Sequence, residues 1–169
     1  SASSGFRAPT LHQIYAQSTQ ASFAGGNIVL SGLFNNRSKQ AFALGVPLLT
    51  PEKSTNISLG LGFNPTKNLN ITVDFYSITI KDRIVYSSSI SSNDPSSQLY
   101  QILQQAGVAS IQFFINGLKT RNAGIDLVAN YKNINLGSGK LGVNLAGNFT
   151  LNNEIVGTPN DPAAIKAAG

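Results

Sequence analysis

Hydrophobic and polar residues alternate with a period of two along several stretches of this chain. Between residues 55 and 64 the odd positions are mostly apolar, whereas the even positions are small or polar. A period of two is typical of a β-strand, in which successive side chains point to opposite faces. The same pattern returns at 69–75, after the turn-forming sequence NPTKN at 64–68. We therefore predict a long antiparallel hairpin with strands near 54–64 and 69–82.

Two further stretches, near 120–132 and 141–152, predict strands of similar length. Strands of soluble sheets average about five to six residues, whereas a tilted strand that crosses a bilayer needs about nine to eleven. The predicted strands fall in the second range. Within 69–82 the alternation changes phase between Phe75 and Tyr76, and either a β-bulge or the exit of the strand from the membrane accounts for this change.

Long and short connections alternate along the chain. The long ones, near 16–53 and 87–118, are rich in Ser, Gln and Asn, and the short ones follow the strands near 64 and 132. We expect a helical turn at 11–15, a brief strand at 27–30 and capped helices at 36–44 and 97–106. Tight turns on one side and elaborate loops on the other are typical of an up-and-down transmembrane barrel. We therefore predict an all-β fold of long antiparallel up-and-down strands, part of a transmembrane β-barrel, with short helices in the long loops.

The two faces of these strands suggest two different environments. Apolar positions such as Ile57, Leu59, Val73, Val143 and Leu145 would face lipid, and Phe63 and Tyr131 would lie in an aromatic girdle before the short turns. The opposite face carries side chains whose polar atoms would be left unpaired in lipid. We predict that these residues line the lumen: Asn56, Ser58, Thr72, Asp74, Asp126, Asn130, Asn144 and Asn148.

Composition narrows the function classes. Only 11% of the residues are charged, against about a quarter in typical soluble domains. The net charge of +5 is dispersed, so we expect no nucleic-acid partner. Cysteine is absent, and the single histidine, His12, has no acidic neighbours and reads as a packing or surface residue. We expect no catalytic, cofactor-binding or metal-binding residues and no enzymatic activity; the ligand-binding residues stay unassigned.

Three sequence blocks together resemble the barrels of TonB-dependent outer-membrane receptors. They are GFRAP at 5–9, LTPEKS at 49–54 and FFINGLKTRNAGID at 113–126, in the order in which that family has them. The resemblance covers nearly the whole chain. It implies a larger barrel with an N-terminal plug, of which residues 1–169 would form a partial β-barrel domain of about five strands, without the plug.

The resemblance also implies a function. The chain would lie in the outer membrane of a Gram-negative bacterium and bind a scarce ligand, such as an iron–siderophore, haem, cobalamin or a sugar, at extracellular loops. Its partners would be outer-membrane lipid, the plug domain of the same parent chain and an inner-membrane energy-coupling protein. The residue pattern by itself leaves two alternatives open, a soluble β-sandwich for binding or adhesion and a passive porin-like barrel.

Overall fold

The computed structural model describes residues 1–156, and these residues form two compact units. The sheet unit comprises Ser1–Gly5, Ser54–Ile80 and Thr120–Val156. The loop unit comprises Phe6–Lys53 and Lys81–Lys119. Each unit is described by itself below. No helix among residues 1–156 is both long enough and apolar enough to cross a membrane.

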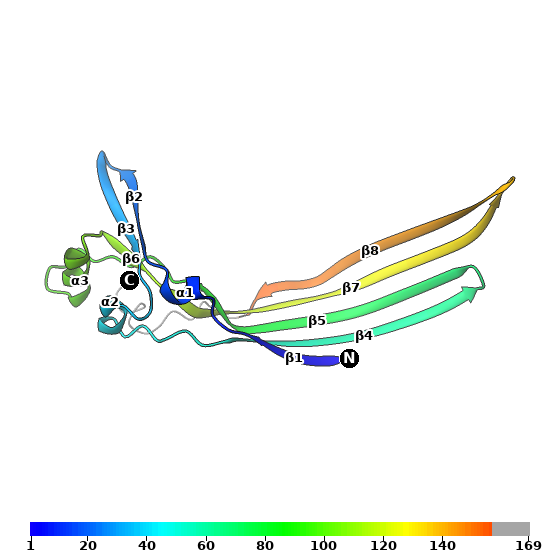
Figure 1. The fold of residues 1–169 in the computed structure, drawn as a ribbon, viewed down its shortest axis with the longest axis horizontal. Coiled ribbons are helices and arrows are strands. Elements are labelled where there is room, and N and C mark those ends of the chain that lie inside the picture. The colour runs from blue at the N-terminus through cyan, green and yellow to red at the C-terminus, as the bar shows by residue number, and fades with distance from the viewer. Residues whose placement is uncertain (157–169) are drawn as a thin grey trace. The chain divides into compact units, whose positions relative to one another are not determined.

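The sheet unit is built on long strands that follow one another in space as they do in sequence. The strands are β1 (Ala2–Arg7), β4 (Glu52–Thr66), β5 (Leu69–Tyr86), β7 (Phe114–Leu136) and β8 (Gly139–Ile155). They form one sheet in the order β1-β4-β5-β7-β8, and Figure 1 shows the four longest side by side. Very short turns join β4 to β5 and β7 to β8. The predicted all-β class with antiparallel sheets and few helices is therefore confirmed.

The register of β7 and β8 keeps polar residues opposite polar residues. Asp126 pairs with Asn148 and Asn130 with Asn144, while Ala129 pairs with Leu145 on the other face. The register shifts twice, once between Ala123 and Gly124 and once between Tyr131 and Ile134. Bulges of this kind bend a strand and increase its twist, which a curved wall requires.

One face of the sheet unit exposes large apolar side chains. Along β4 the exposed fractions are 53% for Ile57, 64% for Leu59 and 66% for Leu61, and Leu145 and Phe149 of β8 are 64% and 60% exposed. Patches of this extent on a protein surface mark a binding partner or an apolar solvent. The structure therefore contains both faces that the alternation predicts, one apolar and one polar.

The change of phase after Phe75 does not move Tyr76 to the apolar face. The side-chain amide of Asn148, which lies on the polar face, donates a hydrogen bond to the Tyr76 hydroxyl at 3.2 Å. Tyrosine counts as apolar in a hydropathy pattern, but its hydroxyl suits it to a polar surface. Further along β5, Asp82 has a positive φ of 57°.

The loop unit contains a smaller sheet and three short helices. Strands β2 (Ser18–Ala24) and β3 (Asn27–Leu33) form a hairpin, and β6 (Ser110–Gln112) pairs parallel to β3. Gly25 and Gly26 turn the hairpin with φ of 58° and 83°, which side-chain-bearing residues rarely adopt. The brief strand expected at 27–30 is therefore longer, and β2 was not expected at all.

The helices of the loop unit begin at side-chain caps. In α1 (Leu11–Tyr15), Thr10 forms a capping box with Gln13, and in α3 (Gln98–Ala106) Ser97 caps the start and Gly107 ends the helix with φ of 66°. The helix expected at 36–44 is shorter, because α2 (Lys39–Ala43) begins only after its cap, Ser38. The side chain of Asn36 instead donates hydrogen bonds to the carbonyls of Pro47 and Phe114, at 2.8 Å each.

A single hydrophobic core holds the loop unit together. Phe113 and Ile111 at its centre have no exposed surface, and Leu103 of α3 is 2% exposed. Both long connections contribute to this core, which consists of Phe34, Ala41, Leu44, Val46, Ile90, Leu99, Ile102, Leu103, Val108, Ile111, Phe113 and Ile115. The loops are therefore a folded body with its own interior.

Candidate functional site

Two polar side chains fix the backbone around the loop core, the buried Ser87 and the partly exposed Asn116. The Ser87 hydroxyl accepts a hydrogen bond from the Phe113 amide at 3.1 Å. The side chain of Asn116 bonds to both backbone groups of Thr50 and also donates to the carbonyl of Asp82 at 2.7 Å. These contacts connect chain segments that are far apart in sequence and so hold the two connections against each other.

Glu52 makes a charge-assisted contact with Arg7 in the loop unit. Its carboxylate accepts hydrogen bonds from the Arg7 guanidinium at 2.9 and 2.5 Å and from the Ile84 amide at 2.8 Å. The carboxylate is buried, whereas the Arg7 side chain is 54% exposed. The hydrogen bond from Arg7 is the main reason that the pKa of Glu52 lies below its ordinary value, although burial opposes the shift.

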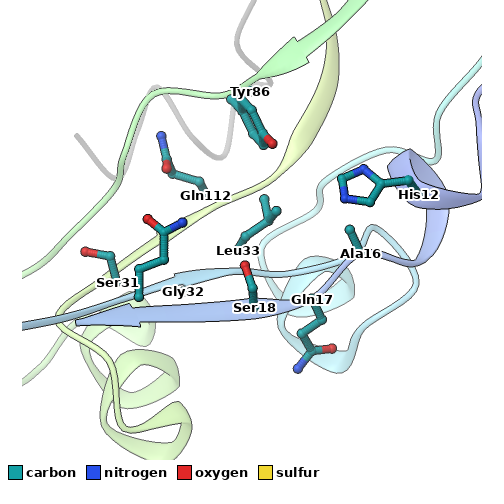
Figure 2. Close-up of a pocket in the computed structure, with 10 residues that line it drawn as sticks. His12, Ala16, Gln17, Ser18, Ser31, Gly32, Leu33, Tyr86 and Gln112 are labelled. Atoms are coloured by element: carbon teal, nitrogen blue, oxygen red, sulfur yellow. The ribbon is translucent and has the colours of Figure 1, made fainter.

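A cavity of about 540 Å³ opens in the loop unit beside the β2–β3 hairpin. Its lining comes from α1 and the segment after it, from β2 and β3, from Tyr86 at the end of β5, and from β6. Figure 2 shows the side chains of His12, Leu33 and Tyr86 directed toward a common space. A volume of this order accommodates a small molecule.

The aromatic residues at the cavity rest on Phe114. The Tyr86 ring stacks on Phe114 with 4.5 Å between centroids and 29° between planes, and the His12 ring approaches Phe114 edge-on at 6.0 Å. Phe114 is buried, while Tyr86 keeps 54% of its surface exposed. The sequence predicts a packing or surface role for His12, and its ring lies exposed at the wall of this cavity.

The remaining lining is polar and uncharged. Gln17, Ser18, Gln20, Ser31 and Gln112 contribute amides and hydroxyls. Gln112 also donates a hydrogen bond to the carbonyl of Ser87 at 3.1 Å, which holds its side chain. The long connections are visibly rich in Ser, Gln and Asn. The sequence alone does not identify ligand residues among them, because nothing local in the chain shows that Tyr86 and Gln112 meet β2 and β3.

The proposed lumen-lining residues of β7 and β8 form hydrogen-bonded pairs across the strands. The amide of Asn148 donates to Asp126 at 2.6 Å as well as to Tyr76, and the amide of Asn144 donates to Asn130. A Cβ placed on Gly124 would lie 2.5 Å from the Tyr76 hydroxyl and 2.8 Å from the Phe149 carbonyl oxygen. The glycine therefore leaves room for the hydroxyl end of the Tyr76 ring.

The other proposed lumen residues lie on β4 and β5. The hydroxyls of Ser58 and Ser1 share a hydrogen bond of 2.7 Å, and Asn56 donates to the Ser3 hydroxyl at 3.4 Å. Asp74 lies over Gly60, where a Cβ would collide with the carboxylate. Thr72, two residues earlier on β5, shares the side of Asp74. These residues are therefore polar side chains on β4 and β5, of which Ser58 and Asn56 bond to residues at the N-terminal end of the chain.

Among residues 1–156, no group of three His, Asp or Glu side chains is placed to hold a metal ion. The polar face and the cavity contain groups that donate and accept hydrogen bonds. Groups of this kind can form hydrogen bonds with water or with a polar ligand.

Comparison with known proteins identifies the family to which the polar face and the cavity belong. A model of the family described as "TonB dependent receptor-like, beta-barrel" matches residues 1–166. A search of curated proteins finds no match to the chain. The matched range includes all of β1 to β8, and it excludes a soluble β-sandwich as the reading of the alternating strands. The family is one of outer-membrane transport receptors of Gram-negative bacteria, whose members carry a plug domain. The chain belongs to the TonB-dependent receptor-like β-barrel family.

Proposed function

We propose that this chain forms part of the barrel wall of an outer-membrane receptor that imports a scarce small ligand, bound at the long connections 16–53 and 87–118. The observation that carries the proposal is the family match over residues 1–166. The folded core shared by the two connections supports it, since a receptor needs binding side chains held in fixed positions. The connections would lie on the extracellular side.

The two faces of the sheet unit would then separate lipid from a polar lumen. The apolar side chains of β4 and β8 would contact the hydrocarbon region, where each unpaired polar group costs several kcal/mol. The lumen face would carry Asn56, Ser58, Thr72, Asp74, Asp126, Asn130, Asn144 and Asn148. Their mutual hydrogen bonds leave further donors and acceptors for water or for the plug domain of the parent receptor.

Import against a gradient requires energy from outside the barrel. We propose that the parent receptor obtains it from an inner-membrane coupling protein through its plug. A passive pore would equilibrate its solute instead. Uptake by cells that express the receptor should therefore stop when the proton gradient is collapsed with an uncoupler; uptake that continues unchanged would indicate passive flow.

Two neighbouring residues on opposite faces of β4 can test whether the sheet unit separates lipid from a polar lumen. The chain contains no cysteine, so Ser58→Cys and Leu59→Cys each introduce one thiol into these 169 residues for a fluorescent label. The labelled receptor would be reconstituted in vesicles with a lipid-soluble quencher. We expect strong quenching at residue 59 and weak quenching at residue 58. Equal protection at both positions would contradict the membrane wall.

A further inference from the structure

The described lining of the cavity beside the β2–β3 hairpin is polar and, apart from His12, has no ionisable group other than the Tyr86 hydroxyl. Its ten described lining residues include no Lys, Arg, Asp or Glu. The chain as a whole carries 12 basic residues, yet the structure places none in this lining. An anionic ligand such as a carboxylate or catecholate iron chelate is normally bound through Arg or Lys, because charge-assisted hydrogen bonds offset the loss of its hydration. The lining therefore suits a ligand without net charge.

The cavity offers a flat apolar surface among hydrogen-bonding groups. Phe114 supports one side of the Tyr86 ring, while more than half of the Tyr86 surface stays exposed. Leu33 and Ala16 add smaller apolar patches. Because Phe114 already holds the Tyr86 ring in place, the ring loses little conformational freedom when a ligand stacks on its other face.

The polar groups around this ring are suited to hydroxyls. Glutamine amides and serine hydroxyls donate as well as accept, so they pair with ligand hydroxyls in either orientation. Some of these groups are already held in place, since Gln112 bonds to the Ser87 carbonyl and Ser31 accepts from the Ser110 hydroxyl at 3.1 Å. A pyranose ring presents an apolar face of C–H groups and a rim of hydroxyls, which matches an aromatic surface bordered by amides and hydroxyls.

Resting on the proposed function, we infer that this cavity binds a neutral, hydroxyl-rich ligand of the saccharide class. One sugar ring stacks on Tyr86, and its hydroxyls bond to Gln20, Gln112 and Ser31. This assignment selects one ligand class among those open to a receptor of this family, and it names Tyr86 as the main contact.

The test uses the full receptor chain, purified in detergent, with two sets of probes. The first set contains neutral oligosaccharides of the malto-, cello-, xylo- and manno-series on a glycan array; the second contains anionic ferric chelates. Binding of the retained probe is then measured by calorimetry with Tyr86→Ala, Tyr86→Phe and Phe42→Ala. Phe42 is the control, because it is an exposed aromatic residue of the loop unit that is not among the residues lining the cavity.

We expect a neutral oligosaccharide to bind saturably, with an affinity about tenfold or more weaker for Tyr86→Ala and nearly unchanged for Tyr86→Phe and Phe42→Ala. Retention of ferric chelates alone, or of no saccharide at all, would overturn the inference, as would binding that Tyr86→Ala leaves intact. The uptake assay with an uncoupler separates this failure from that of the proposed function. A receptor that imports a ferric chelate in an energy-dependent way would refute the saccharide class and keep the transport role.

Discussion

The Glu52 carboxylate and the Arg7 guanidinium form a bidentate pair, with N–O distances of 2.9 and 2.5 Å, between the start of β4 and the end of β1. The same carboxylate accepts the Ile84 amide of β5. One side chain thus connects three strands where they enter the loop unit. Both residues lie in blocks that carried the family resemblance, GFRAP and LTPEKS. The pair gives those blocks a structural role.

Removing Arg7 should destabilise the loop unit. Arg7→Ala removes the paired cation from the buried Glu52 carboxylate, which keeps the Ile84 amide and the nearby charge of Arg83. We expect a clear loss of stability, moderated by solvent because the Arg7 side chain is 54% exposed. Denaturant unfolding can be followed with a fluorophore on Ser91→Cys. Arg37→Ala, which removes an exposed guanidinium that lies over the Tyr15 ring, is the control and should cost about 0.5 kcal/mol. Equal losses would contradict a special role for the pair.

Acid should weaken the loop unit through Glu52. Because the pKa of Glu52 is lower in the folded chain than its ordinary 4.5, the pair contributes its full stability above about pH 4.5 and loses it as the pH falls through the lowered value. The unfolding midpoint of the loop unit should therefore drop over this range. Glu52→Gln should remove this part of the acid dependence, and Glu154→Gln should keep it. A wild-type midpoint that stays constant below pH 4.5 would count against the assignment.

Gly124 should not tolerate a side chain. Gly124→Ala places a methyl group against the Tyr76 hydroxyl and the Phe149 carbonyl, and we expect a cost of about 1–3 kcal/mol in the sheet unit. Gly62→Ala is the matched control, since nothing lies within 4 Å of its added Cβ. Adding Tyr76→Ala to Gly124→Ala should recover part of the loss, as a double-mutant cycle would measure. No coupling in that cycle would mean that the tyrosine ring does not press on Gly124.

Phe113 should be the most sensitive position of the loop core. Its side chain is fully buried, so Phe113→Ala is expected to cost about 3–5 kcal/mol. Hydrogen exchange should increase in α2 and in α3 together, because both pack on this core. Phe23→Ala, at a residue that is 77% exposed, should leave exchange unchanged. Loss of protection in only one helix would show that the two connections fold separately.

The long strands could be predicted from the sequence because their signal is local. The alternation at 54–64 lies within β4, and that at 141–152 lies within β8. A period of two also determines which residues share a face, so Asp126 meets Asn148 and Asn130 meets Asn144 as the pattern requires. The strands extend further than the pattern, since pairing in the loop unit lengthens β5 and β7 past their alternating parts.

The loop unit was less predictable because its contacts join distant segments. Strand β3 pairs with β6, and the hydroxyls of Ser31 and Ser110 bond across 79 positions of sequence. No periodicity reports such pairing. In β2 the polar Ser18, Gln20 and Ser22 alternate with Thr19, Ala21 and Phe23, but this stretch is shorter and less apolar than the long strands. Tyr86 and Gln112 therefore join the cavity without any local signal in the chain. Their role depends on Phe114 and Ser87, which the sequence does not place beside them.

The shared interior of the two connections limits how such a receptor can change during evolution. Residues before β4 and residues after β5 fill one core, so a change of volume in one connection must be matched in the other. Exchanging a single loop between related receptors would leave half of an interior behind, whereas exchanging both would transfer a complete unit. New specificity should therefore arise through coordinated substitutions in 16–53 and 87–118, and designers who graft binding loops onto this scaffold would do best to move them as a pair.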